Sequence, residues 1–111
     1  MTAAATVSRP AAGRGRMVSV AISRAERREG RRERVVATVG RDHADAALDL
    51  LELLELAWHD CYGDVSPSED IVDDVLLVSR GRLDQLIHAA RLAVTDWRDL
   101  KVAAERRRSE T

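Results

Sequence analysis

The stretch from Asp45 to Tyr62, DAALDLLELLELAWHDCY, carries the strongest apolar pattern in this chain. At 100° per residue, most of its large apolar side chains fall on one arc and most of its acidic side chains fall on the other, which is typical of an amphipathic helix. Its adjacent leucine pairs break the alternation that a strand would need. We therefore expect a central helix over residues 43–62, around which the rest of the chain must pack.

Two further helices are expected after the central one, at residues 67–78 and 80–105. The run SPSE at residues 66–69 places Ser at the N-cap, Pro at the first helical position and Glu at the third, which is a capping box. Asp42 or Asp45 is expected to cap the central helix, Gly63 to end it, and Ser79 to cap the third helix. The predicted fold class is all-α, a small three-helix bundle in a helical domain at residues 34–108.

The N-terminal part of the chain is strongly basic. Residues 1–41 hold ten Arg and three Glu, a net charge of +7, whereas residues 42–111 carry −8. We predict that residues 1–33 are a basic, mostly disordered arm, because like charges four residues apart oppose a helix there. Such a segment would order best against something acidic. The basic arm is defined by Arg24, Arg27, Arg28, Arg31, Arg32 and Arg34.

An alternative interpretation makes the fold α+β. Residues 17–23 and 34–39 both alternate apolar and polar side chains, so they could pair as a short hairpin across the charged stretch between them. A two-stranded sheet is marginal unless it packs on another element.

An acidic ridge runs along one face of the expected central helix. Its carboxylates recur three or four residues apart, and they are Asp42, Asp45, Asp49, Glu52 and Glu55. Uncompensated acids at this spacing repel each other. The ridge is therefore either a solvated face or a surface that receives arginines, from the arm of this chain or from a partner.

No set of residues has the spacing of a known catalytic, cofactor or metal motif. The chain contains no CxxC, HExxH or GxSxG, and the acidic loop at residues 60–71 fails the calcium-loop pattern. Cys61 is expected to be a buried structural thiol, and His59 and His88 to be solvated. No catalytic, cofactor-binding or metal-binding residue is therefore assigned, and a small enzyme using His59 and Cys61 is the least favoured function.

These observations favour a non-enzymatic protein-interaction or regulatory module. The rival is a nucleic-acid-binding protein that uses the arginine-rich arm, but the arm lacks aromatic residues for base stacking and the body is acidic. A single cysteine suits the reducing cytoplasm, and no apolar run approaches the length of a membrane span. We expect a cytoplasmic protein with no membrane partner.

Self-association is the last expectation from sequence. Five apolar residues fall outside the main apolar arc of their predicted helix, and they are Leu48, Leu56, Leu77, Leu92 and Val102. A domain of this size gains from further burial, and symmetric dimers are the commonest way to obtain it. We therefore expect a homodimer with the central helix at its interface.

Overall fold

The computed structural model describes residues 22–110, and in that range it contains five α-helices, one short 3-10 helix and no strand. The elements are α1 (Arg24–Val39), η1 (Arg41–His43), α2 (Ala44–Tyr62), α3 (Glu69–Ser79), α4 (Leu83–Thr95) and α5 (Trp97–Ser109). The all-α prediction is confirmed for this part of the chain, but the three-helix bundle is corrected to five helices.

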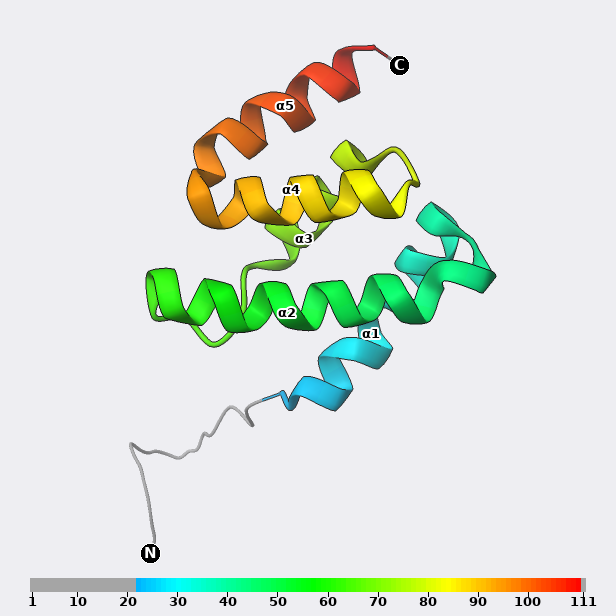
Figure 1. Cartoon of the computed structure of the whole chain (residues 1–111), viewed down its shortest axis with the longest axis vertical. Helices are drawn as coiled ribbons and strands as arrows, with labels where there is room; N and C mark the ends of the chain where they lie inside the picture. Colours follow the sequence, from blue (N-terminus) through cyan, green and yellow to red (C-terminus); the bar gives the residue numbers. More distant parts are fainter. Residues whose placement is uncertain (1–21, 111) are drawn as a thin grey trace, which may run out of the picture.

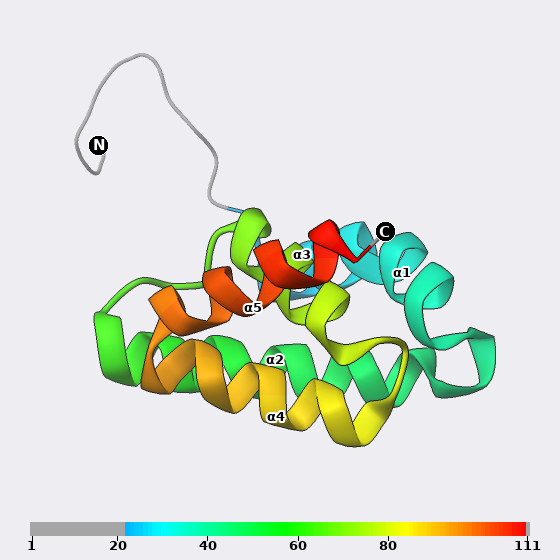
Figure 2. The same cartoon turned by 90° about the horizontal axis from the view of Figure 1, so that it is seen from above.

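The helices form one compact arrangement around a shared core (Figure 1). Figures 1 and 2 show α2 and α4 side by side and running in the same direction, with α1, α3 and most of α5 on one side of that pair. The Tyr62 hydroxyl at the end of α2 donates hydrogen bonds to the carbonyls of Ala93 and Val94 near the end of α4. This contact ties the C-terminal ends of the two parallel helices together.

The central helix is present where its apolar pattern predicts it. Leu51, Leu54 and Trp58 of α2 are buried in the core, and Gly63 ends the helix in a left-handed conformation (φ 84°) that favours glycine. The predicted cap is wrong, because His43 occupies the N-cap position and makes no side-chain cap hydrogen bond. The turn of η1, directly after Gly40, leads into α2 instead.

Helix α3 begins two residues later than the capping box predicts. Its N-cap is Ser68, whose hydroxyl accepts a hydrogen bond from the Ile71 N–H at 3.3 Å. Ser66 and Glu69 do not form the expected reciprocal pair, because both side chains instead bind an arginine of α1. A non-local contact has therefore overridden a local capping signal.

The predicted helix at residues 80–105 is two helices. Asp96 has an extended backbone (φ −159°, ψ 95°), and its carboxylate caps α5 by accepting a hydrogen bond from the Arg98 N–H at 3.0 Å. The break lets α5 fold back so that it contacts both α3 and α4, and Leu100 becomes buried. Ser79 is the last residue of α3 rather than a cap, and Arg82 takes the N-cap position of α4.

The basic arm is a helix over most of its described length. Residues 24–39 form α1, which starts with a capping box between Ser23 and Glu26, so the boundary at residue 33 and the strand at 34–39 are both wrong. The other strand of the hairpin, 17–23, lies mostly outside the described residues, as does the arm before residue 22. Helix α1 forms despite its like-charged pairs because its arginines are neutralised by α2 and α3.

The core is small and draws on every helix. It is built mainly from Leu, Val and Ala side chains, with Trp58 at the end of α2. No helix in the described range 22–110 is long and apolar enough to cross a membrane.

Two glycines give a matched test of this packing. Gly81, in the turn between α3 and α4, has φ 78°, and a Cβ there would lie 2.6 Å from the backbone oxygen of Thr38 in α1. Gly30 is helical, and a Cβ there would meet nothing. We expect Gly81→Ala to lower the free energy of unfolding by more than about 1 kcal/mol and Gly30→Ala to raise it by up to about 1 kcal/mol. Urea unfolding of both variants at equal protein concentration measures this, and equal effects would contradict the packing of the turn on α1.

Candidate functional site

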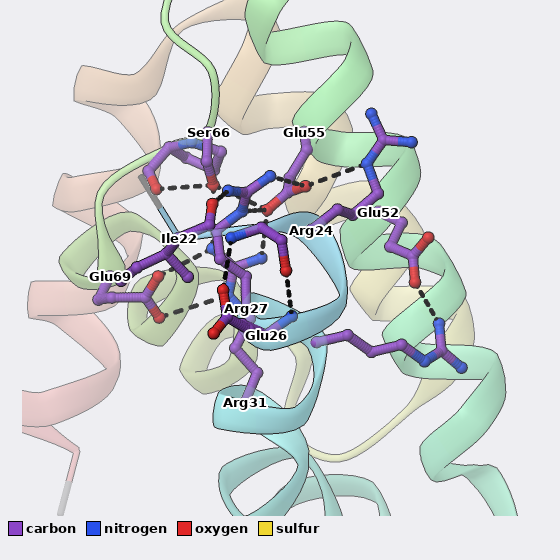
Figure 3. A network of polar contacts seen from close by, with 12 residues as sticks. Ile22, Arg24, Glu26, Arg27, Arg31, Glu52, Glu55, Ser66 and Glu69 are labelled. Carbon is purple, nitrogen blue, oxygen red and sulfur yellow. Dashed lines mark hydrogen bonds and ion pairs between the residues drawn. The ribbon is translucent and has the colours of Figure 1, made fainter. Parts of the chain in front are cut away.

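The most organised polar cluster in the structure lies where α1 packs against α2 and α3 (Figure 3). Arginines of α1 recur at a helical spacing that points several of them at one flank of α2. The loop after α2 and the first turn of α3 supply the remaining oxygen atoms. We refer to the cluster formed by Arg27, Arg31, Glu55, Ser66 and Glu69 as the arginine–carboxylate network.

Glu55 is the centre of the network. Its side chain is only 2 % exposed, and it accepts two hydrogen bonds from Arg27, at 2.5 Å from Nε and 3.0 Å from Nη2. Arg31 Nη1 donates a further bond at 2.8 Å, and the Ser66 hydroxyl donates one at 2.9 Å. Oε2 therefore accepts three hydrogen bonds, from Arg27, Arg31 and Ser66, and Oε1 accepts one from Arg27.

Arg31 connects the two acids of the network. It is as buried as Glu55, at 2 % exposure, and its guanidinium bonds Glu55 on one side and Glu69 on the other, the latter at 2.8 Å. Arg34 extends the contact by donating to Glu69 at 2.5 Å and to Asp73 at 2.6 Å. These bonds join α1 to α3, with which α1 otherwise makes few contacts.

A second, exposed row of pairs continues along α1 and α2. Arg28 donates to Asp49 at 2.8 Å and to Glu52 at 2.5 Å, and Arg32 donates to Asp45 at 2.9 Å. The carboxylates of Asp45 and Asp49 are largely in water, where such pairs contribute at most about 1 kcal/mol each. These pairs make the facing surfaces of α1 and α2 electrostatically complementary, but they contribute little to the stability of the fold.

The network lowers the pKa of both of its acids. Burial raises the pKa of Glu55, but the hydrogen bonds from Arg27, Ser66 and Arg31 together lower that pKa more, so it lies below its ordinary value of 4.5. The pKa of Glu69 is lowered in the same way, with bonds from Arg31 and Arg34 outweighing burial. Because these pKa values are lower in the folded state, the stabilisation is present above the unfolded pKa and is lost as pH falls through the folded pKa.

The acidic ridge expected from sequence is therefore divided in the structure. Asp45, Asp49 and Glu52 face arginines of α1, Asp42 lies in η1 and is exposed, and Glu55 is buried rather than on an outer face. All six arginines of the basic arm lie in or beside α1, and each is within 4 Å of a carboxylate. The surface that receives arginines is thus filled by this chain's own α1.

A second buried acid was missed by sequence reasoning. Asp74 of α3 is 2 % exposed and accepts bonds from Lys101 at 2.9 Å and Arg108 at 2.7 Å. In a helical projection Asp74 falls outside the apolar arc of its helix, with the exposed acid Asp73. The signal that was available is the pair of basic residues seven apart on α5, but only the break at Asp96 turns them toward α3.

The histidines and the cysteine do not converge on a site. Cys61 is exposed, so the predicted buried thiol is wrong, and His59 and His88 are exposed as well. The nearest hydrogen-bonding contact of the His59 ring is the Asp64 carbonyl, at 3.3 Å. Within the described range 22–110, no group of three His, Cys, Asp or Glu side chains could hold a metal ion.

The five apolar residues of the expected interface fall into three groups. Leu48 is buried in the core, at 1 % exposure, so it is not available to a second copy. Leu77 and Leu92 are half-buried. Leu56 and Val102 are exposed, on α2 and α5.

Two further exposed apolar residues lie on the parallel helices α2 and α4. Leu53 of α2 is 60 % exposed and Ile87 of α4 is 51 % exposed. At 100° per residue Leu53 lies opposite the core-facing residues of α2, and Ile87 lies on the flank of α4 opposite Gln85, which faces α5. Both side chains therefore lie on the solvent side of these two neighbouring helices. Half-buried apolar residues accompany Leu53 and Ile87 on the same two helices, and we refer to all of them together as the apolar strip. The half-buried members are Leu50, Ala57, Leu83, Ala90 and Val94.

No known protein family, curated protein or solved structure matches this chain.

Two substitutions of an acid by its amide compare the buried network with the exposed row of ion pairs. We expect Glu55→Gln to lower the free energy of unfolding by about 3 kcal/mol or more, because it leaves buried guanidinium groups without their charge partner. We expect Asp49→Asn, which removes an exposed acid from the same helix face, to change it by no more than about 1 kcal/mol. Urea unfolding at fixed protein concentration and pH 7 measures both, and similar losses in the two variants would show that burial of the network adds nothing.

Proposed function

We propose that this chain is a non-enzymatic protein-interaction module of the cytoplasm that self-associates into a homodimer through the outer face of α2 and α4. The observation that carries the proposal is the apolar strip on that face. Leu53 and Ile87 are each more than half exposed on neighbouring parallel helices, in continuity with half-buried apolar side chains. Contiguous exposed apolar residues on a small domain are a feature of interaction surfaces.

A second copy of the chain is the occupant that best fits this strip. The core of the folded part is small, and a domain of this size gains stability from further burial. Each fully buried Leu or Ile contributes roughly 1.5–3 kcal/mol, so covering Leu53 and Ile87 on both copies would add substantially to the folded state. Figure 2 shows α1, α3 and α5 on one side of the α2–α4 pair, and the other side is the face on which a second copy would dock.

The arrangement of the arginines supports this proposal over nucleic-acid binding. A nucleic-acid interface needs guanidinium groups that are free to contact phosphates. The arm arginines of α1 instead face carboxylates of α2 and α3, and two of them are fixed around Glu55. An enzymatic function using His59 and Cys61 receives no support from their exposed, separate positions.

Charge substitutions in the strip test the dimer. We expect Leu53→Glu on α2 and Ile87→Glu on α4 to shift the protein toward a 12.3 kDa monomer and to lower its melting temperature. Val102→Glu is the matched control, because Val102 is similarly exposed (55 %) but lies on α5. Sedimentation equilibrium at micromolar concentration measures the mass. A monomeric wild-type protein, or a control that dissociates as readily as the strip variants, would contradict the proposal.

A further inference from the structure

A cavity of about 250 Å³ lies between α3, α4 and the C-terminal end of α5, away from both the arginine–carboxylate network and the apolar strip. Val78 and Ala103 form its apolar lining. The remaining lining is polar and unusually basic for an acidic protein body. It comprises Arg80, Gln85, Arg106, Arg107 and Glu110.

Three arginines and one glutamate line this cavity. Arg80 follows α3 in a left-handed conformation (φ 55°), and its Nη2 donates to Glu110 at 2.8 Å. Arg107 is 3.6 Å from the same carboxylate oxygen, which is an ion pair without a hydrogen bond. Arg106 forms no ion pair with any residue in the range 22–110. The cavity therefore holds an excess of two positive charges.

Arg107 also carries an unsatisfied donor. Its Nε is the one side-chain polar atom, among the described residues, that is buried without a hydrogen-bond partner. A buried donor left unpaired is costly, and most such groups in native proteins are satisfied. The Nε atom is itself enclosed by protein, so the terminal Nη groups of Arg107 are the donors that an anion in the cavity can reach. A guanidinium can give an anion several charge-assisted hydrogen bonds at once.

We propose that this cavity binds an oxyanion, a phosphate or carboxylate group of a small molecule, through Arg80, Arg106 and Arg107. Gln85 supplies a neutral amide donor on the α4 side. Glu110 is the in-chain competitor, because its carboxylate already lies against Arg80 and Arg107. The site is independent of the proposed dimer, since none of these residues belongs to the apolar strip.

Arginine side-chain NMR on the full chain tests the site directly. The Nε–H signal of Arg107, assigned by its loss in Arg107→Lys, is followed while inorganic phosphate or acetate is added at constant ionic strength, with chloride as the reference. We expect a saturable shift with phosphate, acetate or both, and none with chloride. The comparison of the two anions separates a phosphate site from a carboxylate site.

Three variants distinguish binding from a structural role of the same arginines. We expect Arg80→Gln to weaken anion binding about tenfold or more, and Glu110→Gln to strengthen it by removing the competitor. Arg91→Gln removes an exposed arginine of α4 outside the cavity, so we expect no change from it. If the arginines only stabilise the negative C-terminal end of the α5 dipole, the Nε–H signal of Arg107 will not shift with either anion. That result, or equal weakening by Arg91→Gln and Arg80→Gln, would overturn the proposal.

Discussion

The buried carboxylate of Glu55 is the interaction on which the N-terminal half of the structure depends. An ionised acid at 2 % exposure is strongly unfavourable unless donors surround it. Here the donors come from two places: Arg27 and Arg31 of α1, and Ser66 of the loop before α3. Satisfying one carboxylate therefore positions a helix and a loop together. It also explains why α1 exists as a helix, since its own like-charged pairs oppose helix formation and only Val35 and Val39 among its apolar residues are buried.

The three flanks of α2 lie in three different environments. One flank faces the core through Leu51, Leu54 and Trp58, and the adjacent flank carries the acids that bind α1. Helix α4 packs against the remaining flank, and Leu53 is left in solvent. The acidic side of α2 is thus covered by the arginines of this chain's own α1. The proposed interaction surface lies where apolar residues of α2 remain exposed. The basic cavity at the end of α5 is separate from both.

Local signals in the sequence were sufficient for some elements and insufficient for others. The apolar period of α2 and the stop at Gly63 predict that helix closely. Helix α1 could not be predicted, because the residues that stabilise it are distant: Arg31 binds Glu69, 38 positions later. The sequence did indicate that this segment orders best against acids and that the ridge can receive arginines. It did not indicate that Glu55 is buried, because a helical projection places Glu55 in one row with the exposed acids of the ridge. The break at Asp96 was hidden by apolar periodicity that continues across it, from Val94 to Leu100.

The pKa of the Glu55 carboxyl group is the most direct test of the central role of the network. Carbon-detected NMR titration of the glutamate side chains, with Glu55 assigned by its absence in Glu55→Gln, measures it in the intact protein. If arginine pairing outweighs burial, the pKa of Glu55 lies below the ordinary value of 4.5. A pKa clearly above 4.5 would mean that Glu55 is buried without effective charge partners, and it would contradict the account of how α1 is held.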